Sequence, residues 1–99
     1  MGKVALRFTS QAQKDLAELA ETPSLQKRLR AVRKALGLLE TNQRHPSLQT
    51  HAYRSLSGPR GETVFEAYAE NRTPAAYRIF WFWGPNKDEI TVVAITPHP

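Results

Sequence analysis

Residues 77–83 read YRIFWFW, and this stretch decides the fold. Apart from Arg78, every side chain in it is aromatic or aliphatic, so an extended strand here is apolar on both faces. Such a strand lies inside a sheet that is covered on each side. We therefore expect residues 75–83 to form the central strand, with helices on one face and a partial cover on the other.

Other segments are predicted to complete the sheet. Residues 63–69 precede the central strand and residues 89–96 follow it, each bounded by turn-forming residues. Residues 3–9 alternate between apolar and polar side chains, which is typical of a half-buried strand. Residues 42–63 are polar and contain several Pro and Gly, and we interpret them as a loop.

Two amphipathic helices are predicted between the first strand and this loop. Ser10 offers an N-cap hydroxyl to the first helix. The second begins near Pro23 and ends near Glu40, and its apolar residues follow steps of four and three: Leu25, Leu29, Val32, Leu36 and Leu39. The order β-α-α-β-β-β predicts an α+β fold, in which a mainly antiparallel, curved sheet packs against an N-terminal α-hairpin.

Length and composition indicate one globular domain covering residues 1–99, with 40% hydrophobic and 23% charged residues. The chain has no cysteine, which excludes disulfide frameworks, thiolate nucleophiles and Cys-type zinc sites. The longest apolar run, residues 79–83, is far shorter than the roughly 20 residues that span a bilayer. Charged residues also interrupt the N-terminus where a signal peptide is apolar. We therefore expect a cytoplasmic protein that does not contact a membrane.

The net charge of +5 is concentrated in one segment. Residues 1–22 are neutral, residues 23–60 carry a net +7, and residues 61–99 carry a net −2. A basic surface of this kind binds the phosphates of nucleic acid, docks an acidic protein partner, or is simply a solvated helix face. Three of its residues share one face of the second predicted helix: Lys27, Arg30 and Lys34.

Arg78 is the sharpest candidate site residue, because a guanidinium within an apolar strand is costly unless it is paired. One interpretation is an ion pair with Glu66 or Glu70 on the neighbouring strand. The other is a phosphate clamp on the floor of the sheet, which requires an accessible guanidinium. Alternation places Glu66 on one face with Val64 and Tyr68, so its carboxylate is a general base or the partner of Arg78.

The histidines are candidates for proton transfer. His45 and His51 lie in the predicted loop and His98 follows the last strand, an arrangement without metal-ligand spacing, so we expect no metal and no cofactor. Histidine exchanges a proton near neutral pH. Pro97 and Pro99 restrict the backbone on either side of His98. That residue is either a solvent-exposed terminal side chain or a group that exchanges a proton near neutral pH.

Several residues are candidates for binding RNA. His51, Tyr53 and Arg54 combine an imidazole, a phenol and a guanidinium, which suits single-stranded RNA because bases stack on rings and phosphates bind cations. An ordinary polar loop is the alternative. Arg60 and Arg72, in the connections around the next strand, belong to the same candidate set.

Together these features resemble the RelE/ParE superfamily of toxins from type II toxin–antitoxin systems, over nearly the whole chain. The matching elements are, in order, Phe8-Thr9 with the helix around Lys14-Asp15-Leu16, the basic second helix, Pro46, Leu56-Ser57-Gly58, Tyr77-Arg78-Ile79 and the last strand with its short tail. The resemblance implies a sheet like that of microbial ribonucleases. It also implies a cognate antitoxin protein as partner, in a hetero-oligomer.

The resemblance implies one of three activities. RelE-, HigB- and YoeB-like members cut mRNA in the ribosomal A site without a metal, whereas ParE-like members inhibit DNA gyrase and have no nuclease site. A degenerate member would only bind its antitoxin. The histidine near the C-terminus favours the RNA-cleaving branch.

For that branch the resemblance also implies residue roles. A base removes the proton of a ribose 2′-OH, which attacks the adjacent phosphate, and an acid protonates the departing 5′-oxygen. Arg78 would bind the scissile phosphate and His98 would donate the proton.

The resemblance also implies roles in RNA contact and in proton abstraction. Arg54 and Tyr53 would touch RNA or the reacting phosphate. The strand lysines of RelE are replaced by Glu66 and Tyr68, so the role of the base falls to Glu66 or His51.

Overall fold

The computed structural model describes residues 3–98. The N-terminal half contains β1 (Ala5–Phe8), α1 (Ser10–Glu21), a 3-10 turn η1 (Pro23–Leu25), α2 (Gln26–Thr41) and a second 3-10 turn η2 (Pro46–Leu48). The C-terminal half contains β2 (His51–Ser57), β3 (Thr63–Tyr68), β4 (Tyr77–Trp83) and β5 (Glu89–Pro97).

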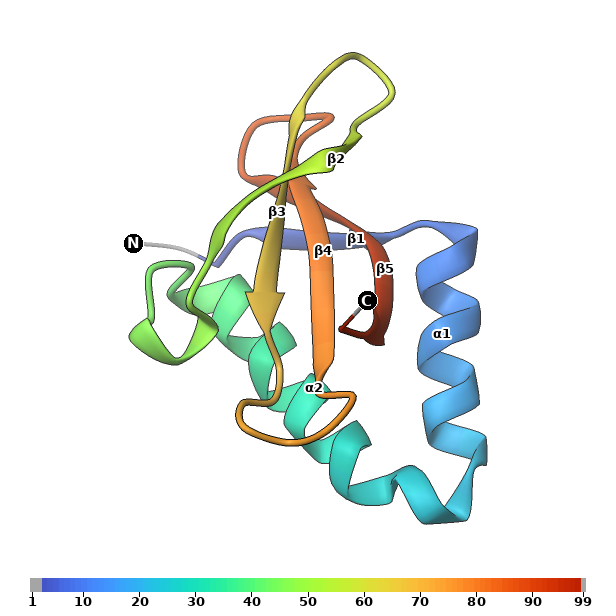
Figure 1. Cartoon of the computed structure of the whole chain (residues 1–99). Coiled ribbons are helices and arrows are strands. Elements are labelled where there is room, and N and C mark those ends of the chain that lie inside the picture. The colour runs from blue at the N-terminus through green and yellow to red at the C-terminus, as the bar shows by residue number, and fades with distance from the viewer. Residues whose placement is uncertain (1–2, 99) are drawn as a thin grey trace.

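The strands form one sheet in the order β1-β5-β4-β3-β2. β1 pairs with β5 in parallel, and the other neighbours are antiparallel. Figure 1 shows α2 passing behind β3 and β4, with α1 beside β5. The predicted α+β class, with a mainly antiparallel sheet against an α-hairpin, is therefore confirmed. Neither helix in residues 3–98 has the length and apolar character needed to cross a membrane.

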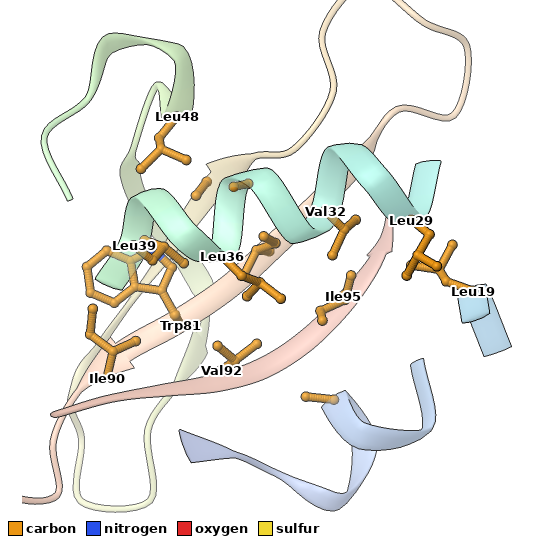
Figure 2. Packing of buried hydrophobic residues seen from close by; sticks show 14 residues of the cluster. Leu19, Leu29, Val32, Leu36, Leu39, Leu48, Trp81, Ile90, Val92 and Ile95 are labelled. Carbon is orange, nitrogen blue, oxygen red and sulfur yellow. The ribbon is translucent and has the colours of Figure 1, made fainter. Parts of the chain in front are cut away.

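The main core lies between α2 and the sheet, as Figure 2 shows. The apolar stripe predicted for the second helix is buried there, except that Leu25 is only partly covered and lies in η1, because α2 begins at Gln26 and not near Pro23. β4 is the central strand, as predicted, and both of its faces are packed. Its Ile79 and Trp81 face the helices, whereas Phe80 and Phe82 join a smaller cluster on the opposite face.

The junction between β1 and α1 protects the edge of β5. A register shift between β4 and β5 leaves Val93 as an extra residue, at the point where β1 ends. Helix α1 supplies the missing partners: Thr9 Oγ1 donates to the carbonyl of Val93 (2.8 Å), and Asp15 Oδ2 accepts from the backbone N–H of Ile95 (2.9 Å). The edge is thereby closed to further strand pairing.

The prediction that residues 42–63 form a loop is wrong. That range contains η2 and the whole of β2, so His51, Tyr53 and Arg54 lie on a strand. β2 is an edge strand whose side chains are almost all exposed. Because it joins the sheet through backbone pairing with β3, its sequence carries no apolar alternation for a pattern search to find.

The helix and strand ends differ slightly from the predictions. Thr9, not Ser10, is the N-cap of α1, because Thr9 is extended and its Oγ1 accepts the N–H of Ala12 (3.1 Å), whereas Ser10 is already helical. β1 is shorter than predicted and β4 begins at Tyr77, after Ala75 with a positive φ of 54°.

Replacing Leu39 with Ala tests the core between α2 and the sheet. Leu39 is fully buried, so we expect Leu39→Ala to lower the free energy of unfolding by about 3 kcal/mol. Leu56→Ala is the matched control, because Leu56 is 43% exposed and its loss should change that free energy by less than about 0.5 kcal/mol. Urea unfolding followed by circular dichroism measures both, and equal effects would contradict this description of the core.

A candidate active site around Glu66

Glu66 of β3 lies at the centre of a polar cluster on the sheet face opposite the helices. Its register partners are His51 in β2 and Phe80 in β4. Nε2 of His51 is 2.8 Å from Oε1 of Glu66, and Nδ1 of His98, after β5, is 3.1 Å from Oε2. The Glu66 carboxylate is 3% exposed, whereas the two imidazoles are about half exposed. A substrate therefore meets the imidazoles first.

Arg78 of β4 lies beneath this cluster as a buried cation. Its Nε is 3.6 Å from Oε2 of Glu66, and its Nη1 donates to the carbonyls of Glu70 (2.9 Å) and Tyr77 (3.3 Å). The ring of Tyr68 covers the guanidinium, with 3.6 Å between Cζ and the ring centroid. The predicted ion pair with Glu66 is thus present. The phosphate-clamping role stays a prediction, because the guanidinium is next to the His98–Glu66 pair but is covered.

The carboxylate of Glu70 pairs with Arg28 of α2 instead. Arg28 Nη1 lies 2.9 Å from Glu70 Oε1 and also donates to the carbonyl of Ala75 (2.9 Å). The same Oε1 accepts the backbone N–H of Tyr77 (3.0 Å). Burial raises the pKa of the Tyr77 phenol, and the positive charge of Arg28 offsets part of this increase. This network ties α2 to the β3–β4 connection and so fixes the two strands that carry Glu66 and Arg78.

The hydrogen bonds of the two imidazoles are different. Nδ1 of His51 is 2.9 Å from the carbonyl of Gln49, which can only accept, so this nitrogen is a donor. His98 is anchored by its own backbone N–H, which donates to the carbonyl of Ala76 (2.7 Å). Nε2 of His98 makes no hydrogen bond within residues 3–98. It is the nitrogen of the cluster that is available to a substrate oxygen.

The structure brings together four of the predicted site residues: His51, Glu66, Arg78 and His98. Tyr53 lies on the same face, with its ring 4.8 Å from that of Phe80. Sequence reasoning gave no role to Tyr68, although alternation places it on the same face as Glu66. Its place over Arg78 depends on the register of β3 with β4, in which these two residues are partners.

Other predicted RNA-binding residues lie away from the cluster. Arg54 is on β2, Arg60 is in the β2–β3 turn and Arg72 is in the β3–β4 loop; none has a side-chain hydrogen bond or ion pair with the cluster within residues 3–98. Three more residues are exposed on α2, behind the sheet: Lys27, Arg30 and Lys34. Pro99 lies outside the described residues. No three His, Cys, Asp or Glu side chains of the described chain are placed to hold a metal ion.

Comparison with known proteins places this arrangement in a known fold. The chain matches no protein-family model and no curated relative. A chain of the archaeal RelE–RelB complex from Pyrococcus horikoshii OT3 superposes with a TM-score of 0.65 at 14% identity, over 96% of this chain and 94% of that one. This protein has the RelE-type toxin fold.

Two further structures share the RelE-type fold. The YoeB dimer from Staphylococcus aureus gives a TM-score of 0.64 at 12% identity, covering 98% of this chain and 99% of that chain. A chain of the DinJ–YafQ toxin–antitoxin complex from E. coli gives 0.63 at 17% identity, covering 97% and 93%. At such identities the likeness concerns the fold, and the activity has to be argued from the cluster itself.

Breaking the buried ion pair tests the electrostatics of the cluster. Glu66→Leu leaves the Arg78 guanidinium buried beside an apolar side chain, and we expect it to lower the free energy of unfolding by about 3 kcal/mol. Combining it with Arg78→Met removes both charges and should recover most of that loss. Urea unfolding of the single and double variants measures the coupling, and additive effects would contradict a buried ion pair.

Proposed function

We propose that this protein is the toxin of a type II toxin–antitoxin pair and that it cleaves mRNA on the ribosome by metal-free transesterification. One observation carries the proposal: a buried carboxylate, Glu66, is held between two half-exposed imidazoles, those of His51 and His98. This provides a base and an acid within one hydrogen-bonded group. The fold supports the toxin role, because a chain of the RelE–RelB complex and a chain of the DinJ–YafQ toxin–antitoxin complex have this fold.

The proposed reaction needs one proton acceptor and one proton donor. The ribose 2′-oxygen bonds to phosphorus while its proton passes to Nε2 of His51, which must turn away from Oε1 of Glu66 to face the substrate; Glu66 is the alternative acceptor. The bond from phosphorus to the 5′-oxygen breaks, and Nε2 of His98 gives its proton to the departing oxygen. The products are a 2′,3′-cyclic phosphate and a free 5′-hydroxyl. The Glu66 carboxylate orients both imidazoles in the free protein.

Arg78 contributes positive charge beneath the reacting phosphate. Its guanidinium is 3.6 Å from Oε2 of Glu66 and strengthens the field that stabilises the phosphoryl oxygens. A direct contact with the phosphate requires the ring of Tyr68 to move aside, because that ring covers the guanidinium. We propose that substrate binding displaces this ring.

The basic surface supports anionic partners. Seven of the eight basic residues in the 23–60 segment are exposed and form no ion pair within residues 3–98; Arg28 is the exception. Arg54, together with Tyr53 and His51 on β2, is closest along the chain to the cluster and is proposed to bind RNA, with Arg60 and Arg72 at the two ends of β3. Lys27, Arg30 and Lys34 on α2 are proposed to contact the ribosomal RNA or an acidic segment of the antitoxin.

Mapping of mRNA cleavage in a translation extract tests the reaction. His98→Gln keeps the size and polarity of the side chain but cannot transfer the proton, so we expect the cleavage rate to fall at least about a hundredfold. His51→Gln should act in the same direction. Lys14→Gln is the control substitution and should cleave at the native rate, because Lys14 is exposed on α1, away from the cluster.

Three outcomes would contradict the proposal. Cleavage by His98→Gln at the native rate would exclude the proton donor. Native protein that arrests growth without cutting mRNA, but inhibits supercoiling by purified gyrase, would indicate the ParE-like activity. A protein without any toxicity would be a degenerate antitoxin-binding member.

A further inference from the structure

A second concave site lies on the opposite face of the sheet from Glu66. It is a cavity of about 580 Å³ between the 43–50 segment and the sheet, within the size range of small-molecule sites. Its lining includes Arg44, His45, Thr50, Phe65, Trp81 and Trp83. The proposed reaction uses none of these side chains.

Aromatic rings form the floor of this cavity. The ring centroids of Phe65 and Trp81 are 4.9 Å apart, and those of Trp81 and Trp83 are 5.4 Å apart. Figure 2 shows Trp81 in the core beside Leu39 and Ile90, where it is 2% exposed. Trp83, in contrast, is 44% exposed. An exposed indole beside a buried one is a platform on which a planar ring can stack.

The rim of the cavity offers hydrogen-bond donors and no negative charge. Arg44 is exposed and forms no ion pair within the described part of the chain, and no Asp or Glu lines the cavity. Nδ1 of His45 accepts the backbone N–H of Ser47 (3.1 Å), so the proton of the neutral ring is on Nε2, which is a donor. The buried hydroxyl of Thr50 has no hydrogen-bond partner among residues 3–98. This rim suits a ligand with acceptors and negative charge.

We propose that this cavity binds one nucleotide of a single-stranded RNA, with the base stacked on Trp83 and the phosphate at Arg44. The 43–50 segment connects it to the cluster, because Gln49 lines the cavity and its carbonyl holds His51. The choice of RNA rests on the proposed function. An aromatic side chain of a protein partner fits less well, because it brings no anion for Arg44.

The two indole N–H signals in a nitrogen–proton NMR spectrum test the proposal directly, because the chain has two tryptophans and both line the cavity. We expect AMP to shift both signals saturably, an oligoadenylate to do so at lower concentration, and ribose 5-phosphate to have no effect. Trp83→Leu should weaken AMP binding about tenfold, with Trp81 as the remaining reporter. Arg44→Gln should remove the preference for AMP over adenosine. Lys14→Gln should leave AMP binding unchanged.

Other results would overturn the inference. These are no saturable shift with AMP, native affinity in both cavity variants, tighter binding of N-acetylphenylalaninamide than of AMP, or binding of AMP without binding of the oligoadenylate. Failure here is distinct from failure of the proposed function. If the native protein cleaves mRNA, His98→Gln does not, and the native protein fails to bind AMP, then only the nucleotide site is excluded. If the native protein binds AMP and the oligoadenylate but cleaves no mRNA, then only the proposed reaction is excluded.

Discussion

The buried carboxylate of Glu66 is the constraint around which this face of the molecule is organised. A carboxylate that is 3% exposed is costly unless charged or polar partners surround it. Here the partners are Arg78 at 3.6 Å and the imidazoles of His51 and His98 at about hydrogen-bond distance. They come from β4, β2 and the tail after β5, so the carboxylate is satisfied only when these segments are in register around β3.

β4 joins this polar cluster to the core. Alternate residues of one strand do two different things: Ile79 and Trp81 pack under α2, whereas Arg78 faces Glu66 on the other side. Phe80, the register partner of Glu66, is the next residue after Arg78 on that second face, and the ring of Tyr68 covers the guanidinium. The low local dielectric strengthens the interaction between the charges and any anion that approaches the cluster.

The short segment between α2 and β2 serves both faces of the sheet. Its side chains line the aromatic cavity next to Trp81 and Trp83, and the carbonyl of Gln49 fixes the orientation of the His51 ring. Gln49 adopts a left-handed conformation with a φ of 44°, which turns the chain from η2 into β2. The same segment therefore contacts both the aromatic cavity on one face and the cluster around Glu66 on the other.

The amino-acid sequence by itself determined the layered architecture, because periodic apolar residues in α2 and the apolar run at 77–83 allow only a helical hairpin on a sheet. It also identified each charged member of the cluster, since Arg78 within an apolar strand needs a partner. Tertiary structure decided the rest. β2 joins the sheet through backbone pairing, so its sequence shows no alternation of apolar and polar side chains. Only that pairing places His51 beside Glu66. The position of the Tyr68 ring over Arg78 depends on the register between β3 and β4. The cavity around Trp83 depends on the course of the 43–50 segment over the sheet. Neither can be read from a local stretch of sequence.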